Sequence, residues 1–333
     1  MLTALKCPNC AAPLPPSTET TVVCPYCAHT ITGVPAVPWG AKLLREPWSG
    51  RPEDSGKQRV VVAGRPYVVL GRLGVGDGCD VFLGRLDARL TELVVLKVLR
   101  VADDADLLNR EWDVLGRLAG SNARGGDFFA GLLPQRVTHG RLVTAGRPDS
   151  RASVFRYRSG FHYTLAQVAA AHPAGIDPRA GVWMWKRALE MLSWVHASGY
   201  AHAGVTPAHL LIHPRDHGVA LVGWSAASRL GARLVAASTR ARAVYPDDLW
   251  AGAPPRPAHD LTMLARSLRG AMSSSGPRSV PGPLDALLRR YTDPTAAGRV
   301  DDAWALLEQV TDASRAAFGA PAYVPFHMPP KED

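Results

Sequence analysis

Four of the five cysteines lie in the first 27 residues as two matched C-x-x-C pairs. Cys7 and Cys10 form the first pair, Cys24 and Cys27 form the second, and 13 residues separate the pairs. Each pair aims two thiolates at one point, so two pairs complete a tetrahedral all-sulfur site of the kind that holds Zn²⁺. Such a site has no open coordination position. The spacing therefore predicts a structural zinc ion.

The segment around these cysteines is expected to form a zinc ribbon over residues 1–33, with residues 20–23 as one strand. A module of this size buries too little apolar surface to fold without its metal. Iron in a rubredoxin-like site and a redox-active thiol pair are the alternatives, and two symmetric pairs favour one metal. A disulfide scaffold would spread its cysteines over the whole fold.

A glycine-rich segment, a lysine and a glutamate follow in an order that suits phosphate binding. Three glycines, Gly74, Gly76 and Gly78, lie in the run LGVGDGCDVF at residues 73–82, where a bare backbone can approach a phosphate closely. Lys97 ends the run VVLK, and Glu111 comes 14 residues later in a helical pattern. This order resembles that of the protein kinase family, in which a paired lysine and glutamate orient the ammonium toward nucleotide phosphates. The resemblance implies a nucleotide site at Gly74, Gly76, Val81, Lys97 and Glu111.

The decisive pattern is the run LSWVHASGYAHAGVTPAHLL at residues 192–211. With the glycine-rich segment and the VVLK run, it resembles the protein kinase family. That family has a long helix ending in L-H-x-x-G-I-x-H, followed by the catalytic loop H-R-D-L-K-P-x-N-L-L. His202, Pro207, Leu210 and Leu211 keep the family's residues. The resemblance covers about residues 60–318 and implies a two-lobed kinase fold of the Ser/Thr-kinase-like type.

Three positions that carry catalysis in that family have changed. Gly204 stands in place of the catalytic aspartate, and His209 stands in place of a metal-binding asparagine. Gly223, in the run VALVGWS, replaces the aspartate of the D-F-G motif. Glycine offers no side chain, and Mg²⁺ prefers oxygen ligands to imidazole. The resemblance therefore implies a pseudokinase with no catalytic residues and no Mg²⁺ site.

Binding of ATP without a metal is an alternative for the same cleft. The kept glycines and Lys97 favour it, whereas Val95 replaces the small alanine of the family's adenine pocket and narrows the slot. Such a degenerate cleft could transfer phosphoryl or nucleotidyl groups with other residues. Without a nucleotide, Lys97 and Glu111 would remain as a structural ion pair.

Motifs that stabilise the kinase fold keep the family's residues better than the catalytic motifs do. The run Tyr245-Pro246-Asp247 resembles the family's A-P-E motif with a shorter acid, and Asp260 matches the structural aspartate of the helix beyond it. Arg299 matches the arginine that pairs with the A-P-E acid. The resemblance therefore predicts an ion pair between Asp247 and Arg299.

Two further groups could carry chemistry. His202, His209, His213 and His217 could form a second metal site, but His202 corresponds to a core histidine and the others have no metal-motif spacing. Cys79 replaces the third glycine of the glycine-rich segment. It could be a reactive thiol if a cation lowers its pKa, with an inert thiol as the alternative.

The region between residues 225 and 245 is rich in arginine. These side chains could receive an acidic or phosphorylated partner, and a solvated basic loop is the alternative reading. The arginines concerned are Arg229, Arg233, Arg240 and Arg242.

Hydrophobic periodicity places the motifs on strands first and helices afterwards. Strands are expected at residues 60–62, 67–70, 81–83, 93–99, 135–138 and 152–157. Helices are expected at residues 103–118, 165–171, 178–198, 258–272, 283–291 and 303–318. This order predicts an α+β fold with two lobes.

Proline and glycine content sets the expected domain boundaries. A Pro/Gly-rich linker follows the ribbon at residues 34–58. The kinase-like domain spans residues 59–318, with an N-lobe at 59–157 and a C-lobe at 158–318. A proline-rich tail occupies residues 319–333.

Composition limits the setting in which the chain acts. The chain has 333 residues, 47% of them apolar, and no run approaches the roughly 18 apolar residues of a membrane span. No signal peptide fits before Cys7, so a cytoplasmic location without membrane attachment is expected. The net charge of +9 permits an acidic partner, although a GC-rich genome also explains the arginine excess.

Three functions follow from these observations. A kept scaffold with lost catalytic residues favours a regulatory or scaffold protein that binds a partner protein, with the ribbon as a structural or interaction module. A noncanonical nucleotide-binding enzyme is the second hypothesis. Nucleic-acid binding through the ribbon and the arginine-rich surface is the third, weakened because Lys6 is the ribbon's only basic residue before Gly33.

Overall fold

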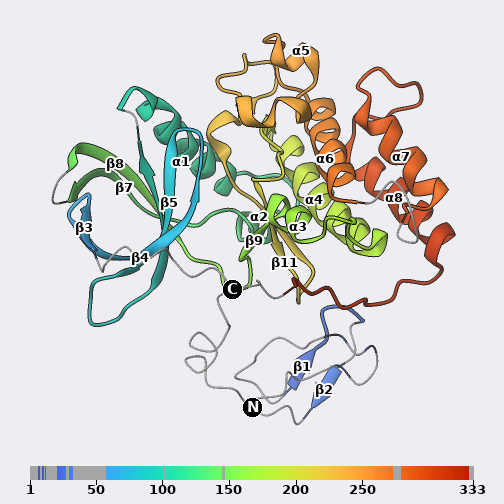
Figure 1. The fold of residues 1–333 in the computed structure, drawn as a ribbon, viewed down its shortest axis with the longest axis horizontal. Coiled ribbons are helices and arrows are strands. Elements are labelled where there is room, and N and C mark those ends of the chain that lie inside the picture. The colour runs from blue at the N-terminus through green and yellow to red at the C-terminus, as the bar shows by residue number, and fades with distance from the viewer. Residues whose placement is uncertain are drawn as a thin grey trace.

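The computed structural model describes residues 7, 10, 12, 21–27, 30–32, 58–100, 102–144, 147–272 and 279–329. In this part of the chain a β-rich lobe lies beside a helical lobe, and a small hairpin lies against the helical lobe (Figure 1). The predicted two-lobed α+β fold is therefore confirmed. The linker predicted at 34–58 falls outside the described residues except for its last position. Among the described residues, no helix combines the length and apolar character that a membrane span requires.

The N-lobe is a closed antiparallel barrel with the strand order β3-β4-β5-β6-β8-β7. Its strands are β3 (Gln58–Val62), β4 (Arg65–Val75), β5 (Cys79–Leu86), β6 (Leu93–Leu99), β7 (Arg136–Thr144) and β8 (Arg147–Arg156). β3 closes the barrel because it pairs with both β4 and β7. Alternate residues of the strands, such as Val94, Leu96 and Val98, fill the interior.

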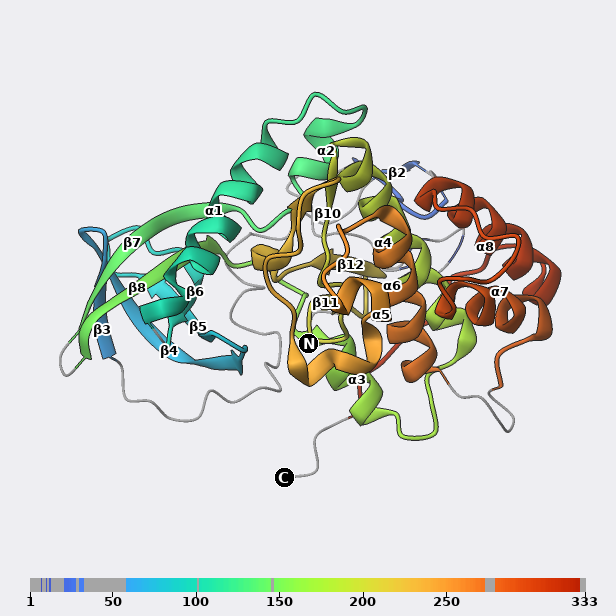
Figure 2. The ribbon, with the colours of Figure 1, turned by 90° about the horizontal axis from the view of Figure 1, so that it is seen from above.

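Helix α1 (Ala105–Ala119) crosses the barrel and faces the C-lobe (Figure 2). A single 3-10 turn (Ala102–Asp104) precedes it, within the predicted helix at 103–118. Its buried face carries Leu108, Leu115 and Leu118 at helical spacing, and Glu111 lies on the same face. A short helix α2 (Gly126–Ala130) follows, which the periodicity did not predict.

The C-lobe is built around two long helices, α4 and α6, each of which has proline in its first turn. Both are buried over much of their length, and Trp185, Leu189, Leu192 and Val195 of α4 lie in the core as expected. The C-lobe helices are α3 (Leu165–Ala171), α4 (Pro178–Ala197), α5 (Asp247–Trp250), α6 (Pro257–Ala271), α7 (Gly282–Thr292) and α8 (Ala303–Phe318).

Short strands and 3-10 turns order the loops of the C-lobe. One small sheet has the order β12-β11-β9, and another pairs β10 with β13. The strands are β9 (Tyr163–Thr164), β10 (Tyr200–Ala201), β11 (Leu210–His213), β12 (Gly218–Leu221) and β13 (Ser228–Arg229). The turns are η3 (Trp224–Ala226) and η4 (Thr239–Val244).

The N-terminal hairpin, β1 (Thr21–Val23) and β2 (Thr30–Thr32), packs on the base of the C-lobe (Figure 1). The Tyr26 ring meets the edge of Tyr323 at 5.2 Å and the edge of His217 at 6.0 Å between centroids. His217 is stacked between Trp183 and Tyr323, at 4.5 Å from each ring. The tail after α8 therefore runs extended between the hairpin and the C-lobe.

The predicted ion pair between Asp247 and Arg299 is wrong. Asp247 instead pairs with Arg242 at 2.5 Å, with its carboxylate at the surface. The Arg299 guanidinium is buried and donates to the Thr262 hydroxyl and the Ala258 carbonyl, each at 2.8 Å. Its hydrogen-bonding capacity is used inside the C-lobe, so it cannot reach the exposed carboxylate.

A different arginine anchors the end of residues 225–245, which correspond to the activation segment of the kinase pattern. The Arg266 side chain of α6 donates to the Tyr245 carbonyl at 2.7 Å and to the Thr292 carbonyl at 2.9 Å. It therefore joins this segment to α6 and to the end of α7. The role predicted for Arg299 is filled by Arg266, through backbone oxygens in place of a carboxylate.

Candidate functional site

The four N-terminal cysteines converge on one point. Their Sγ atoms all lie within 4.8 Å of one another, and they form the only such group of metal-binding side chains in the described part of the chain. The Sγ atoms of Cys7 and Cys27 are 3.6 Å apart, and those of Cys10 and Cys24 are 3.7 Å apart. A tetrahedron with metal–sulfur bonds of about 2.3 Å has edges of about 3.8 Å, so the donor set fits Zn²⁺.

The raised pKa of one of the thiols also favours a bound cation at this site. The Ala12 backbone N–H lowers the pKa of Cys10, but burial and the three neighbouring thiols outweigh it and raise the pKa to about 12. A bound metal ion would neutralise the charge of its thiolate ligands. All four coordination positions would be sulfur, so the site would hold the hairpin together and would perform no chemistry on a substrate.

The predicted pair of Lys97 and Glu111 forms in the cleft between the lobes. The Lys97 Nζ atom lies 2.6 Å from Glu111 Oε2, and the Glu111 side chain is 4% exposed. Burial lowers the pKa of Lys97, but the adjacent Glu111 carboxylate outweighs it, so the pKa is raised and the ammonium stays charged. The second oxygen, Oε1, accepts the Trp224 backbone N–H at 2.9 Å. Glu111 therefore joins β6, α1 and the turn that follows Gly223.

Asp260 holds the backbone of the loop at residues 202–209, which corresponds to the catalytic loop of the kinase pattern. Its buried carboxylate accepts the backbone N–H groups of His202 and Ala203, each at 2.8 Å, and lies 3.0 Å from His196 Nε2. Burial raises the pKa of Asp260, but its interactions with His196 and His202 outweigh it and keep the pKa below its ordinary value. The loop keeps a fixed shape although Gly204 presents no carboxylate.

His209 occupies the space that a metal-binding side chain would need. A Cβ atom on Gly223 would lie only 2.5 Å from the Cδ2 and Nε2 atoms of the His209 ring. His209 Nδ1 lies 2.8 Å from the Gly204 carbonyl oxygen, and because a carbonyl only accepts, Nδ1 carries the proton. Burial lowers the pKa of His209, so the imidazole is neutral at neutral pH. His209 thus lies next to both of the other changed positions, Gly204 and Gly223.

The glycine-rich segment is held by its own neighbours. Gly74 and Val81 pair with each other across β4 and β5, and the Gly76 N–H donates to the Cys79 carbonyl at 2.8 Å. The Arg100 guanidinium caps the carbonyls of Gly76 and Asp77. One of the backbone N–H groups that would face a phosphate is therefore already bonded within the segment.

An ion pair connects the tip of this segment to the activation-segment region. Arg240 Nε lies 3.5 Å from the Asp77 carboxylate, and both side chains are at least half exposed. The pair links the N-lobe with the C-lobe. The sequence did not predict it, because neither residue belongs to a family motif.

Cys79 and the histidine group show no sign of reactivity. Cys79 is buried, and burial raises the pKa of its thiol to about 11, which favours the inert alternative. The four histidines do not gather around one point: His213 pairs with Asp216 at 3.2 Å, and His217 lies in the aromatic stack. The second metal site considered from the sequence does not form among the described residues.

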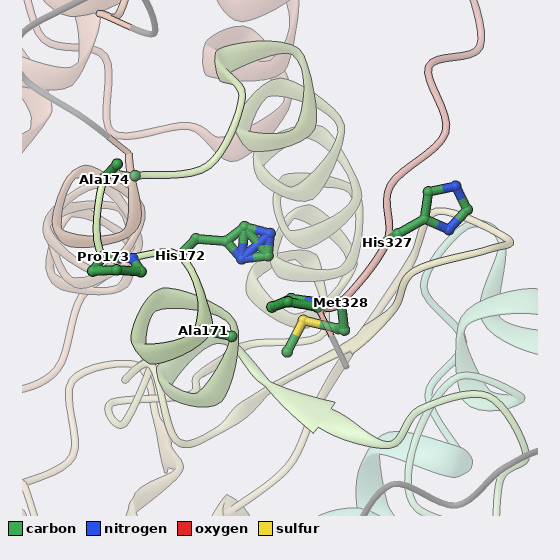
Figure 3. A pocket seen from close by; sticks show the side chains of 8 residues that line it. Ala171, His172, Pro173, Ala174, His327 and Met328 are labelled. Carbon is green, nitrogen blue, oxygen red and sulfur yellow. The ribbon is translucent and has the colours of Figure 1, made fainter. Parts of the chain in front are cut away.

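A shallow hollow lies far from the cleft, where the tail meets the C-lobe. Figure 3 shows the His172 ring and the Met328 side chain facing it. Its volume is about 390 Å³, and its walls are the turn after α3 and the tail. Phe326 of the tail stacks on His172 with 5.4 Å between ring centroids, so the hollow is a product of tail docking.

Comparison with known proteins supports the fold. The crystal structure of the BubR1 kinase domain matches with a TM-score of 0.59 at 13% identity, covering 79% of this chain and 84% of that chain. The structure of vaccinia related kinase 3 matches with a TM-score of 0.59 at 14% identity, covering 82% of this chain and 95% of that chain. No protein-family model matches the chain, and no curated protein matches its sequence. The chain therefore has the protein-kinase fold, preceded by a four-cysteine cluster.

Proposed function

We propose that this chain is a catalytically inactive pseudokinase that acts as a regulatory or scaffold protein by binding a partner protein. The observation that carries the proposal is the contact between His209 and Gly223, where an imidazole fills the place of a metal ligand. The general base is also missing at Gly204. Phosphoryl transfer depends on positioning and on neutralising charge with bound metal, so loss of these groups removes most of the catalysis.

The scaffold around the lost groups supports a binding role. Glu111 ties Lys97 to the Trp224 backbone, and Asp260 holds the catalytic-loop backbone. Arg110 of α1 donates to the Ala227 carbonyl at 2.9 Å, which joins the N-lobe to the activation-segment region. These bonds fix the relative position of both lobes without providing catalysis. A surface of defined shape is what a partner protein would recognise.

The four-cysteine cluster has a structural part in this proposal. Zinc would fold the ribbon, and Tyr26 then packs against the C-lobe and the tail. The ribbon thereby becomes part of the surface that the C-lobe presents. Its role is to shape an interface, with no substrate of its own.

Nucleotide turnover tests the proposal most directly. The full chain is incubated with labelled ATP and either Mg²⁺ or Mn²⁺, with a Lys97→Ala variant beside it. We expect no label transfer above the level of the variant. Transfer that depends on Lys97 would overturn the proposed inactivity. Partner capture by the tagged chain, with its surface variants as controls, then tests the binding role.

Metal-free nucleotide binding is the second candidate, and the charged Lys97–Glu111 pair is the observation that favours it. Asp77 at the tip of the glycine-rich segment and the neutral imidazole of His209 oppose it, because neither neutralises phosphate charge. Thermal-shift measurements with ATP, with and without Mg²⁺, separate the two candidates. A ligand at 100 times its dissociation constant would add about 2.7 kcal/mol to the free energy of unfolding.

A further inference from the structure

Two arginines from different lobes lie near the phenol group of Tyr200. Arg229 of β13 places its Nε atom 3.3 Å from the Tyr200 hydroxyl, and its guanidinium lies 5.9 Å from the centre of that ring. Arg117, in the last turn of α1, lies near enough to Tyr200 for its positive charge to lower the pKa of the phenol. The Tyr200 residue is 6% exposed, whereas both arginines lie at the surface.

The positions of these side chains are fixed by the backbone around them. β10 pairs with β13 so that Tyr200 lies opposite Arg229. The Leu230 N–H donates to the Gly199 carbonyl at 2.9 Å, which extends the pairing. Arg110 donates to the Ala227 carbonyl and to the Ser228 hydroxyl, so α1 is bonded to the residue before Arg229. The backbone of Arg229 is therefore held beside Tyr200 and is linked through Arg110 to α1, the helix that carries Arg117.

The charge of this pair is not balanced locally. Among the described residues, no carboxylate lies within ion-pair distance of Arg117 or Arg229, whereas Arg242, Arg256 and Arg289 each have one. Burial raises the pKa of Tyr200, but hydrogen bonds and charge from Arg229 and Arg117 outweigh it, so the pKa lies below its ordinary value. The site therefore favours an anion.

We propose that Arg117, Arg229 and the Tyr200 hydroxyl bind the phosphate of a phosphorylated segment of a partner protein. The inference rests on the proposed partner-binding function and names the chemistry of the partner. Two guanidinium groups supply paired N–H donors that match a phosphate dianion. Leu230, 40% exposed beside Arg229, offers an apolar contact to the residue that neighbours the phosphate. Because Arg117 belongs to the N-lobe and Arg229 to the C-lobe, the bound phosphate would join the lobes.

A phosphorylated peptide fits the site better than a nucleic acid does. Nucleic-acid binding needs a track of cations that follows several phosphates, and most of the affinity comes from their number. The charge here is concentrated at one point, next to an exposed leucine. Recognition of one phosphate by an arginine pair, with an apolar residue beside it, is the pattern of phosphopeptide binding.

The test selects a ligand with the full zinc-loaded chain. A library of peptides containing phosphoserine, phosphothreonine or phosphotyrosine is selected on the immobilised protein, and the best sequence is synthesised with and without its phosphate. Fluorescence polarisation then measures both forms. We expect the phosphate to strengthen binding at least about tenfold, and Arg117→Ala or Arg229→Ala to remove at least about tenfold each, as hydrogen bonds to charged groups do.

The matched control is the double variant Arg269→Ala with Arg290→Ala, which removes two exposed charges of the C-lobe. It should leave the phosphopeptide affinity within about twofold. Equal binding of the phosphorylated and unphosphorylated peptides would overturn the inference, as would equal losses in the control and in the Arg117/Arg229 double variant. A 12-nucleotide single strand that binds through these arginines, with no phosphopeptide selected, would also overturn it and assign the site to nucleic acid.

The same variants separate this inference from the function on which it rests. If the Arg117/Arg229 double variant still captures the protein that the unaltered chain captures, the partner-binding role stands and the phosphate site is rejected. If neither form captures a partner but the phosphopeptide binds through both arginines, the phosphate site stands and the scaffold role is rejected.

Discussion

The imidazole of His209 lies where the side chain of residue 223 would project, so that a Cβ on Gly223 would come within 2.5 Å of the ring. Gly223 has a φ of 77° and a ψ of 50°, the left-handed region that glycine adopts without cost. The two positions are therefore coupled. A carboxylate can return to residue 223 only if the ring at residue 209 is smaller or moves away.

The first prediction follows from that coupling. Gly223→Asp should lower the free energy of unfolding by about 1–3 kcal/mol, because the new side chain overpacks the site. In a His209→Ala background the same change should cost at least about 1 kcal/mol less. Urea denaturation of both single variants and the double variant measures the interaction as a double-mutant cycle. Simple additivity of the two substitutions would contradict the steric coupling.

The second prediction concerns the buried pair of Lys97 and Glu111. Lys97→Ala leaves a carboxylate that is 4% exposed without its cation, which should cost about 3–5 kcal/mol of unfolding free energy. Arg187 and Glu190 form a matched surface pair at 2.7 Å, so Arg187→Ala should cost less than about 1 kcal/mol. Chemical denaturation at one pH and salt concentration compares the two. Similar losses for both variants would show that the cleft pair is not structural.

The third prediction concerns metal content. The purified chain should contain one zinc ion, and Cys24→Ser should lose it, as measured by atomic emission. Chelation should raise hydrogen exchange in the tail around Tyr323 and in the turn that carries His217, because Tyr26 would leave both. Tyr26→Ala should raise exchange in the same two segments while the zinc stays bound. Unchanged exchange on chelation would mean that the ribbon does not support the tail.

The fourth prediction concerns pH. Burial lowers the pKa of His202 to about 4, against about 6.5 for an exposed histidine. Between these values the unfolded chain binds the proton and the folded chain does not, so stability should fall as the pH falls from 6.5 to 4. Each unit of pKa difference corresponds to about 1.4 kcal/mol. His202→Phe keeps a ring against Trp224, which lies 4.4 Å from His202, and should flatten this slope. Equal slopes in urea denaturation from pH 4.5 to 6.5 would assign the effect to other groups.

The long helices and the cleft pair could be predicted from the sequence, because both rest on local signals. Helix α8 has the predicted bounds, and α4 and α6 agree within a residue at each end. Lys97 and Glu111 could be paired because the resemblance to the kinase family supplied both positions, and the structure places them 2.6 Å apart. The four-cysteine cluster could also be predicted from local sequence, since each C-x-x-C turn brings two of the cysteines together.

The remaining features depend on contacts between residues that are distant in sequence. The closure of the barrel by β3, the Arg240–Asp77 pair and the docking of Tyr26 on Tyr323 have no local signature. The predicted pair of Arg299 and Asp247 was wrong because the resemblance supplied only the residue types. It did not show that the Arg299 guanidinium donates to Thr262 and Ala258, or that Asp247 pairs with Arg242. Short elements such as α2 and β10 are too brief for periodicity to detect.

The docking of Tyr26 against Tyr323 has a consequence for how the chain is made. Tyr26 precedes Tyr323 in the sequence, so a ribosome synthesises the ribbon before the segment against which it packs. Until residue 323 has been made, the aromatic face of Tyr26 has nothing complete to pack on. A chain truncated before residue 323 would display that face to chaperones and proteases.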